Sequence, residues 1–231
     1  MEPALMVIGV NPRCAPVEVR ERFCIPTMRQ ADALSSLHLG DGIAEVMLLS
    51  HGGRTDFILW CNDPSAASGA VLNFLTHEYG LQLNDWKHFY RKLDEAAMAH
   101  VLLAAAGLDA IVRDKDTCEH FKEASVTALQ TGTLGRFLDA VAQRSLAFSR
   151  ELSDMATRDG LEAAEDLARR EAKTFYCRLL RDRITPTIAA LRKRLDDMCI
   201  KELESFYDGL TSLSVEEREL VESFATRLTQ R

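Results

Sequence analysis

The sequence predicts an α+β fold in which a ferredoxin-like domain is followed by a run of helices. The first ninety residues alternate short apolar runs with helix-like segments in the order β-α-β-β-α-β, which is the order of a ferredoxin-like sandwich. From Glu95 onward, every segment has helical periodicity. The stretch 156–160 is polar and ends in glycine, so we expect residues 1–155 to form the N-terminal domain and residues 156–231 a helical dimerisation domain.

Four segments predict the strands of the N-terminal domain. Residues 5–10, 46–50 and 55–61 are short and apolar, and the first of them ends at Asn11-Pro12, a turn signal. His51, Gly52 and Gly53 separate the second and third strands, and paired glycines allow the positive φ angles of a tight hairpin. A weaker fourth strand is expected near residues 88–91.

Helices are predicted between and after these strands. Segments 16–23 and 26–39 each begin with proline, whose missing N–H costs nothing in the first turn of a helix. The other predicted helices are 64–79, 95–106, 117–130, 134 to about 155, 161–180, 186–207 and 214–230. The tail from Leu161 is amphipathic, and its apolar stripe needs a partner. We expect either the N-terminal domain or a second copy of the chain to cover it.

Composition narrows the function classes. The chain has 231 residues, 47% apolar and 27% charged, with no apolar run of the roughly 18 residues that span a bilayer. We therefore expect a cytoplasmic protein that does not enter a membrane. The net charge of −7 disfavours indiscriminate nucleic-acid binding, although the stretch 169–194 is basic. The six cysteines form no CxxC motif, which favours buried thiols over disulfides or a zinc site.

Two polar loops and one histidine stand out as candidates for chemistry. Residues 50–56 form a glycine-rich connection between two strands, and residues 11–16 follow the first strand. Loops on one edge of a ferredoxin-like sheet can approach each other, and loops on a rigid sheet are common functional positions. Alternatively, the glycines only form the hairpin turn, and His100 is an ordinary hydrogen-bonded helix histidine.

Six segments resemble glutamyl-tRNA reductases. Residues 7–21, VIGVNPRCAPVEVRE, are similar to the family's opening GLNHxxAPVxVRE, and residues 49–56, LSHGGRTD, are similar to its LSTCNRTE. Residues 100–109, HVLLAAAGLD, resemble HLFRVASGLDS, and residues 132–150 resemble the GxxGxxLNxLFQxAxxxxK region. In the tail, residues 184–192 and 214–218 are similar to VPxIxxLR and LSxEER of the dimerisation domain. The matches follow the family's order over most of the chain, which is therefore identified as a member.

The resemblance implies a defined chemistry. The family reduces glutamyl-tRNA to glutamate-1-semialdehyde with NADPH, a step of tetrapyrrole synthesis that leads to porphyrins and haem. Its members have a catalytic domain, an NADPH domain and a dimerisation domain. A catalytic cysteine forms a thioester, and hydride from NADPH then releases the aldehyde.

The sequence departs from this pattern at the reacting residues. Gly52 stands at the nucleophile position and has no side chain with which to form a thioester, and Gly53 replaces the neighbouring asparagine. The family's GEPQILxQ stretch is replaced at residues 114–120. The NADPH domain is missing between about Leu152 and Leu161, and no GxGxxG motif occurs in the chain.

Other family positions are retained. Arg54 matches the arginine associated with the substrate carboxylate, and His100 matches the active-site histidine. Asn11 is kept, while the histidine that follows it in the family is Pro12 and the family's glutamate is replaced by Asp56. The resemblance thus implies a substrate-binding set of Asn11, Arg54, Asp56 and His100, with no assigned catalytic residue.

Two classes of function follow. In the first, the chain is a pseudoenzyme, a binding or regulatory paralogue linked to tetrapyrrole synthesis. It would form a homodimer, pair with the true reductase or its regulators, or hold glutamyl-tRNA or a tetrapyrrole. Removing the nucleophile alone costs many orders of magnitude in rate, which favours this class.

In the second class, the chain is an enzyme with altered chemistry. Cys14 would act as a displaced nucleophile with His100 as its base, hydrolysing or transferring an acyl group from glutamyl-tRNA or a related ester. Residual reduction with a partner that supplies NADPH binding is a variant of this hypothesis. Against it, Cys14 is also read as a small buried thiol. No cofactor or metal is predicted, because His51, His77, His88 and His120 share no ligand spacing. Haem binding stays open, since a single Cys or His can ligate haem, and a haem titration would test it.

Overall fold

The computed structural model describes residues 3–109, 116–208, 214, 221 and 223. The chain divides into two compact units, residues 1–176 and 177–231. Most of the predicted helix 214–230, including most of its capping box, lies outside the described residues.

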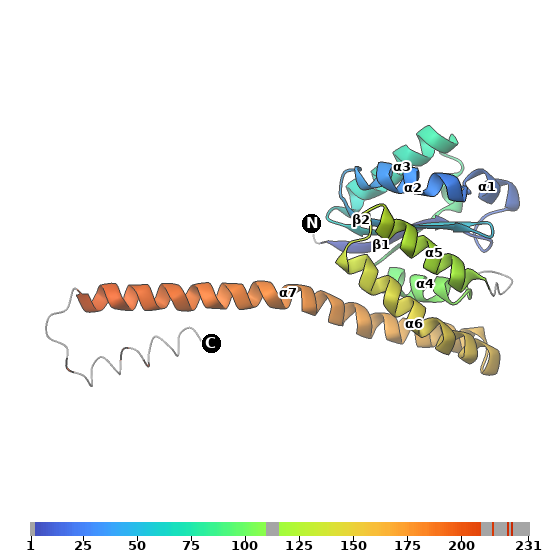
Figure 1. The fold of residues 1–231 in the computed structure, drawn as a ribbon. Coiled ribbons are helices and arrows are strands. Elements are labelled where there is room, and N and C mark those ends of the chain that lie inside the picture. The colour runs from blue at the N-terminus through green and yellow to red at the C-terminus, as the bar shows by residue number, and fades with distance from the viewer. Residues whose placement is uncertain (1–2, 110–115, 209–213, 215–220, 222, 224–231) are drawn as a thin grey trace. The chain divides into compact units, whose positions relative to one another are not determined.

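The first unit is built on a four-stranded sheet (Figure 1). Its strands are β1 (Ala4–Val10), β2 (Ile43–His51), β3 (Arg54–Cys61) and β4 (Tyr90–Leu93). Their order is β2-β3-β1-β4, and every neighbouring pair is antiparallel. This is the strand order of a ferredoxin-like sandwich, so the predicted fold class is confirmed.

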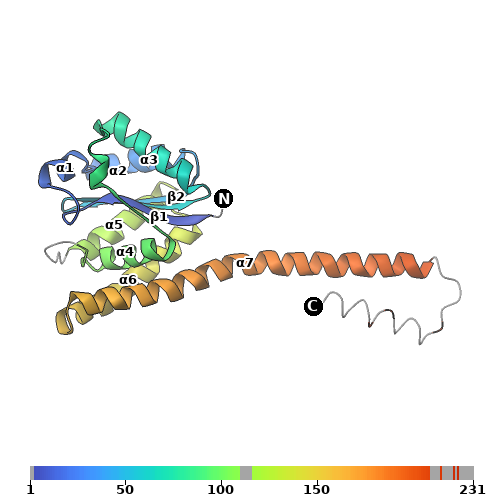
Figure 2. The ribbon, with the colours of Figure 1, turned by 180° about the vertical axis from the view of Figure 1, so that it is seen from behind.

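Helices cover both faces of the sheet. On one face lie α1 (Val17–Arg22), α2 (Thr27–His38) and α3 (Pro64–Tyr79), and on the other lie α4 (Asp94–Ala105), α5 (Thr117–Gln130) and α6 (Arg136–Arg158) (Figure 2). A single 3₁₀ turn, Trp86–His88, precedes β4. All seven residues of β1 and all eight of β3 are buried, which explains why β1 and the stretch 57–61 of β3 are apolar without alternation, whereas β3 begins with the buried polar residues Arg54, Thr55 and Asp56.

The helical tail differs from the prediction. Helix α6 continues to Arg158, so the predicted polar break shrinks to Asp159 and Gly160, and Gly160 has a φ of 94°. The two helices expected at 161–180 and 186–207 are one continuous helix, α7 (Leu161–Asp208). The prediction that a helix starts at Pro186 is wrong, because Pro186 lies inside α7. An interior proline removes one hydrogen bond at a cost of about 3 kcal/mol, but α7 continues through it.

The first four turns of α7 belong to the first unit. Ala164, Ala168 and Ala172 are fully buried at a spacing of four residues, and Phe175 and Tyr176 are also buried. Glu171 accepts a hydrogen bond from Arg144 of α6 at 2.6 Å. The N-terminal domain therefore covers part of the apolar stripe predicted for the tail. No helix among the described residues has both the length and the apolar character needed to cross a membrane.

Candidate functional site

The site begins where β1, β3 and β4 lie side by side. Gly9 of β1 pairs with Asp56 of β3 on one side and with Tyr90 of β4 on the other. A Cβ atom at Gly9 would collide with the Asp56 carboxylate and would lie 2.9 Å from the Tyr90 hydroxyl. The missing side chain therefore lets Asp56 and Tyr90 meet across β1, and the Tyr90 hydroxyl donates a hydrogen bond to Oδ1 of Asp56.

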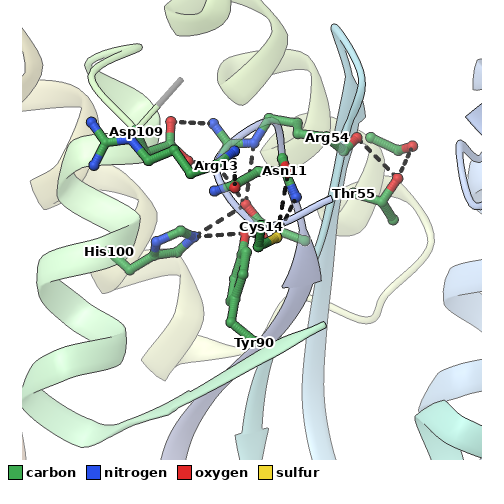
Figure 3. A network of polar contacts seen from close by, with 10 residues as sticks. Asn11, Arg13, Cys14, Arg54, Thr55, Tyr90, His100 and Asp109 are labelled. Carbon is green, nitrogen blue, oxygen red and sulfur yellow. Dashed lines mark hydrogen bonds and ion pairs between the residues drawn. The ribbon is translucent and has the colours of Figure 1, made fainter. Parts of the chain in front are cut away.

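Arg54 is the buried cation of the site, with only 6% of its surface exposed. Its Nε and Nη2 donate to Oδ2 of Asp56 at 3.2 and 2.7 Å. Its Nη1 donates to Oδ1 of Asp109 at 2.6 Å, and its Nη2 donates to the other oxygen of that carboxylate (Figure 3). Two carboxylates thus replace the hydration shell of one guanidinium group.

His100 joins this network from α4. Its Nε2 lies 3.3 Å from Oδ2 of Asp56 and 3.2 Å from the Tyr90 hydroxyl (Figure 3). Burial by itself would raise the pKa of Asp56, but the Arg54 charge, followed by contacts from His100 and Tyr90, holds it well below its usual range. Burial and the neighbouring Asp56 charge raise the pKa of Tyr90 well above its usual value. Asp56 is therefore an anion, and Tyr90 is a neutral hydrogen-bond donor.

The loop after β1 is folded around Asn11. Its side-chain oxygen accepts from the backbone N–H of Arg13 at 3.0 Å, and its carbonyl accepts from the N–H groups of Cys14 and Ala15, both at 3.1 Å. The Cys14 thiol donates to the same carbonyl at 3.3 Å and accepts from the Asn11 N–H at 3.2 Å. Burial raises the pKa of Cys14, so the reactive thiolate is disfavoured.

A cavity of about 610 Å³ opens beside these groups. Its described lining comes from the β1 loop, β4, α4, the turn after α4 and the start of α7: Asn11, Arg13, Cys14, Tyr90, Lys92, Glu95, Ala96, Ala99, His100, Leu103, Asp109, Glu165 and Arg169. Arg13 pairs with Glu165 of α7 at 3.2 Å and donates to the carbonyl of Leu108 at 3.0 Å. Helix α7 therefore supplies part of the cavity wall. Arg54 and Asp56 lie behind the lining residues, and Asp56 is completely buried.

The β2–β3 hairpin forms the turn that the sequence predicts. Gly52 and Gly53 have φ angles of 62° and 74°, and Gly52 is exposed. Arg20 donates to the carbonyl of Gly53 and to that of Ala15, both at 3.1 Å. The two candidate loops are therefore linked, as expected for loops at one edge of the sheet. Gly52 does not line the described part of the cavity.

One group of side chains has the composition of a metal site. Potential ligand atoms of Asp56, His100 and Asp109 lie within 4.8 Å of one another, and all three residues are buried. However, the Arg54 guanidinium already bridges both carboxylates. A divalent cation there would be placed against a buried positive charge, so this arrangement does not fit a metal ion.

Elsewhere, the rings of His51 and His120 are stacked with centroids 3.3 Å apart, a contact that their spacing in the sequence does not reveal.

Comparison with known families identifies the scaffold. Residues 8–155 match the model of the glutamyl-tRNAGlu reductase N-terminal domain, and residues 163–231 match that of its dimerisation domain. The chain belongs to the glutamyl-tRNA reductase family. Only residues 156–162 separate the two matches, so this family member lacks the NADPH domain that the sequence pattern also failed to show.

Two glutamyl-tRNA reductases agree with this assignment in sequence. The chain is 32% identical over 151 residues to a glutamyl-tRNA reductase of Marinobacter nauticus, covering 64% of this chain and 35% of the relative. It is 33% identical over 147 residues to glutamyl-tRNA reductase 2 of Koribacter versatilis, covering 63% and 33%. The solved glutamyl-tRNA reductase from Methanopyrus kandleri is 20% identical, with a TM-score of 0.48 and coverage of 64% and 33%. The matched region spans about a third of each of these proteins.

The structure brings together most of the site residues expected in this family member. Asn11, Cys14 and His100 line one cavity, and Arg54 and Asp56 are bonded to each other behind it. Sequence reasoning did not single out Tyr90 or Asp109. Asp109 was visible as the last residue of the stretch 100–109, which also contains His100. Tyr90 gave no signal, since its role follows from the pairing of β4 with β1 at Gly9.

Proposed function

We propose that this family member is a non-catalytic binding protein that holds a glutamyl-type ligand, such as the glutamyl end of glutamyl-tRNA. The observation that carries the proposal is Gly52, a residue without a side chain at the tip of the β2–β3 hairpin, where the family's nucleophile is expected. A polar cavity lined in part by Asn11 and His100 is nevertheless present. Binding without thioester chemistry is the function that this combination supports best.

The missing NADPH domain adds independent support. Hydride transfer needs a bound nicotinamide, and no stretch between the two matched regions is long enough to fold a nucleotide-binding unit. Loss of the nucleophile alone removes covalent catalysis, and loss of the cofactor domain removes the reduction step. We also propose that the chain forms a homodimer through its dimerisation region and takes part in regulating tetrapyrrole synthesis.

The experiment combines the wild-type chain with a variant that restores a thiol. Wild-type protein mixed with glutamyl-tRNA and NADPH should form no glutamate-1-semialdehyde, with a full-length reductase as the positive control. In the G52C variant, given glutamyl-tRNA alone, the introduced thiol should displace the tRNA hydroxyl from the ester, so that the protein gains the mass of one glutamyl group as a thioester and deacylated tRNA is released. The neighbouring H51C variant is the matched control for nonspecific acylation and should stay unmodified.

The outcomes separate the two parts of the proposal. Semialdehyde formation by the wild-type chain would show that it is catalytic. A folded G52C variant that is not acylated above H51C would show that the site does not place a glutamyl ester at the hairpin. The strain of a side chain at a φ of 62° costs about 1–2 kcal/mol, which a stable domain tolerates.

Acyl transfer through Cys14 is the second candidate. Cys14 and His100 line the same cavity, which favours it, but burial raises the pKa of the thiol and both of its hydrogen bonds described above are to Asn11. A reactive Cys14 would be alkylated by iodoacetamide faster than the exposed Cys177. We expect it to be alkylated more slowly, and the reverse order would revive this candidate.

A further inference from the structure

We propose that Asp109 controls carboxylate binding at Arg54, because its own carboxylate occupies the guanidinium face that a ligand carboxylate would use. This inference rests on the proposed binding function and adds to it a residue that determines ligand preference. Asp109 lies in the turn that follows α4, and this turn forms part of the cavity wall.

The geometry of the Asp109–Arg54 pair is that of a bound carboxylate. A guanidinium group has five N–H donors, and its end-on edge offers two parallel hydrogen bonds to a carboxylate. Asp109 accepts both of them, one from Nη1 and one from Nη2. Asp56 accepts a hydrogen bond from Nε and another from Nη2. A third carboxylate can therefore make two parallel hydrogen bonds to Arg54 only by displacing one of these two aspartates.

Of the two, Asp109 is the one that a ligand meets first. It lines the cavity, whereas Asp56 is completely buried under Gly9 and is held as well by Tyr90 and His100. Asp109 is anchored differently. It follows Gly107, which has a φ of 67°, and Leu108, whose carbonyl accepts a hydrogen bond from Arg13.

The charges lead to the same conclusion. Asp56 remains ionised because its pKa lies well below its usual range, so Asp56 and Asp109 together overcompensate the single charge of Arg54. Arg13, Lys92 and Arg169 in the cavity wall attract an incoming carboxylate, but at Arg54 itself it is repelled until Asp109 moves away, a penalty that an uncharged ligand does not carry. Asp109 thus lowers the affinity of the pocket for free carboxylates relative to neutral amides or esters.

The test measures binding of two matched probes by calorimetry. Glutarate carries two carboxylates, and glutaramide is its uncharged amide counterpart of nearly the same size. The D109N variant keeps the size of the side chain but has no charge and only one oxygen that can accept from Arg54, so a ligand carboxylate displaces it more easily and glutarate should bind at least about tenfold more tightly than to wild type. Its affinity for glutaramide should stay within about twofold. The E95Q variant removes a carboxylate from the same cavity on α4 and should not reproduce the gain.

Each outcome decides the matter. Measurable glutarate binding that is equal in wild type and D109N would overturn the role of Asp109 while leaving the proposed binding site standing. No binding of either probe to any variant would overturn both. An equal gain in E95Q would reduce the effect to general charge in the cavity and would also overturn the proposal. If D109N does not fold, as judged by thermal unfolding, the shorter D109S variant is held to the same criteria.

Discussion

Arg54 is an almost completely buried charge, and its neighbours determine how the site behaves. An isolated buried ion is costly, and the cost is offset only when the partners are close and well oriented. Asp56 and Asp109 meet this condition with four hydrogen bonds to the guanidinium group. The network therefore holds the start of β3 and the turn after α4 in a fixed position relative to each other.

The ionised state of Asp56 predicts a dependence of stability on acid. Its pKa in the folded protein is lower than the value of about 3.9 for an unfolded aspartate, so it stabilises the fold fully above that pH. This contribution is lost as the pH falls below about 4 towards the folded pKa. Urea unfolding should therefore show a free energy of unfolding that declines below about pH 4.

The D56N variant supplies the comparison. It should be less stable than wild type at pH 7 and should decline less steeply between about pH 4 and pH 3. The E119Q variant changes a side chain on the exposed side of α5 and should keep the wild-type slope. A D56N variant whose slope matches that of wild type would show that Asp56 is not the titrating group.

Among the elements, α6 depends on a strand residue for its N-terminus. Its N-cap, Gly135, has no side chain to accept a hydrogen bond. The Glu45 carboxylate of β2 accepts instead from the N–H groups of Phe137 and Leu138, at 3.2 and 2.6 Å. This contact ties α6 to the sheet and places a negative charge at the positive end of the helix.

Removing this carboxylate should destabilise the protein measurably. The E45A variant is expected to lose about 1–2 kcal/mol of unfolding free energy, as measured by urea titration, because two N–H donors lose their acceptor. E45Q keeps an acceptor oxygen and should lose less. If E45A and E45Q are both as stable as wild type, Glu45 does not hold α6.

The elements also show what the sequence can and cannot predict. Helix α5 was predicted with its observed ends, Thr117 and Gln130, because its polar start and the glycine after it are local signals. The sequence predicts two helices in place of α7, because a prediction made from the proline alone takes no account of the long helical segments on either side of it.

The site follows the same division between local and distant information. Arg54, Asp56 and His100 were identified because each lies in a contiguous motif of the family. That Asp56 and Tyr90 meet depends on the registers of β1 with β3 and of β1 with β4. These registers join segments more than thirty residues apart, and no local pattern states them.

At the scale of the whole molecule, the first unit contains more than the matched N-terminal domain. It extends to Tyr176, because the start of α7 buries three alanines and two aromatic residues in it. Tyr176 also accepts a hydrogen bond from the N–H of Leu5 in β1. The domain boundary expected between residues 155 and 156 therefore remains a prediction. The first compact unit is longer and ends at Tyr176.

Two fragments test this longer unit. Residues 1–176 should unfold cooperatively and should be monomeric by light scattering, in contrast to the homodimer proposed for the full chain. The matched fragment 1–158 ends with α6 and lacks the helix that covers it, so it should be less stable. Equal stability of the two fragments would show that the start of α7 does not stabilise the first unit. A dimer of fragment 1–176 would show that dimerisation does not need residues 177–231.

The central claim is that this family member binds a glutamyl ligand without transforming it. The most direct measurement uses tRNA esterified with radiolabelled glutamate, incubated with the full chain and NADPH. We predict that label retained with the protein stays esterified to the tRNA as long as it does in a protein-free control. Transfer of the label to the protein, its accelerated release as free glutamate, or its conversion to semialdehyde would contradict the claim.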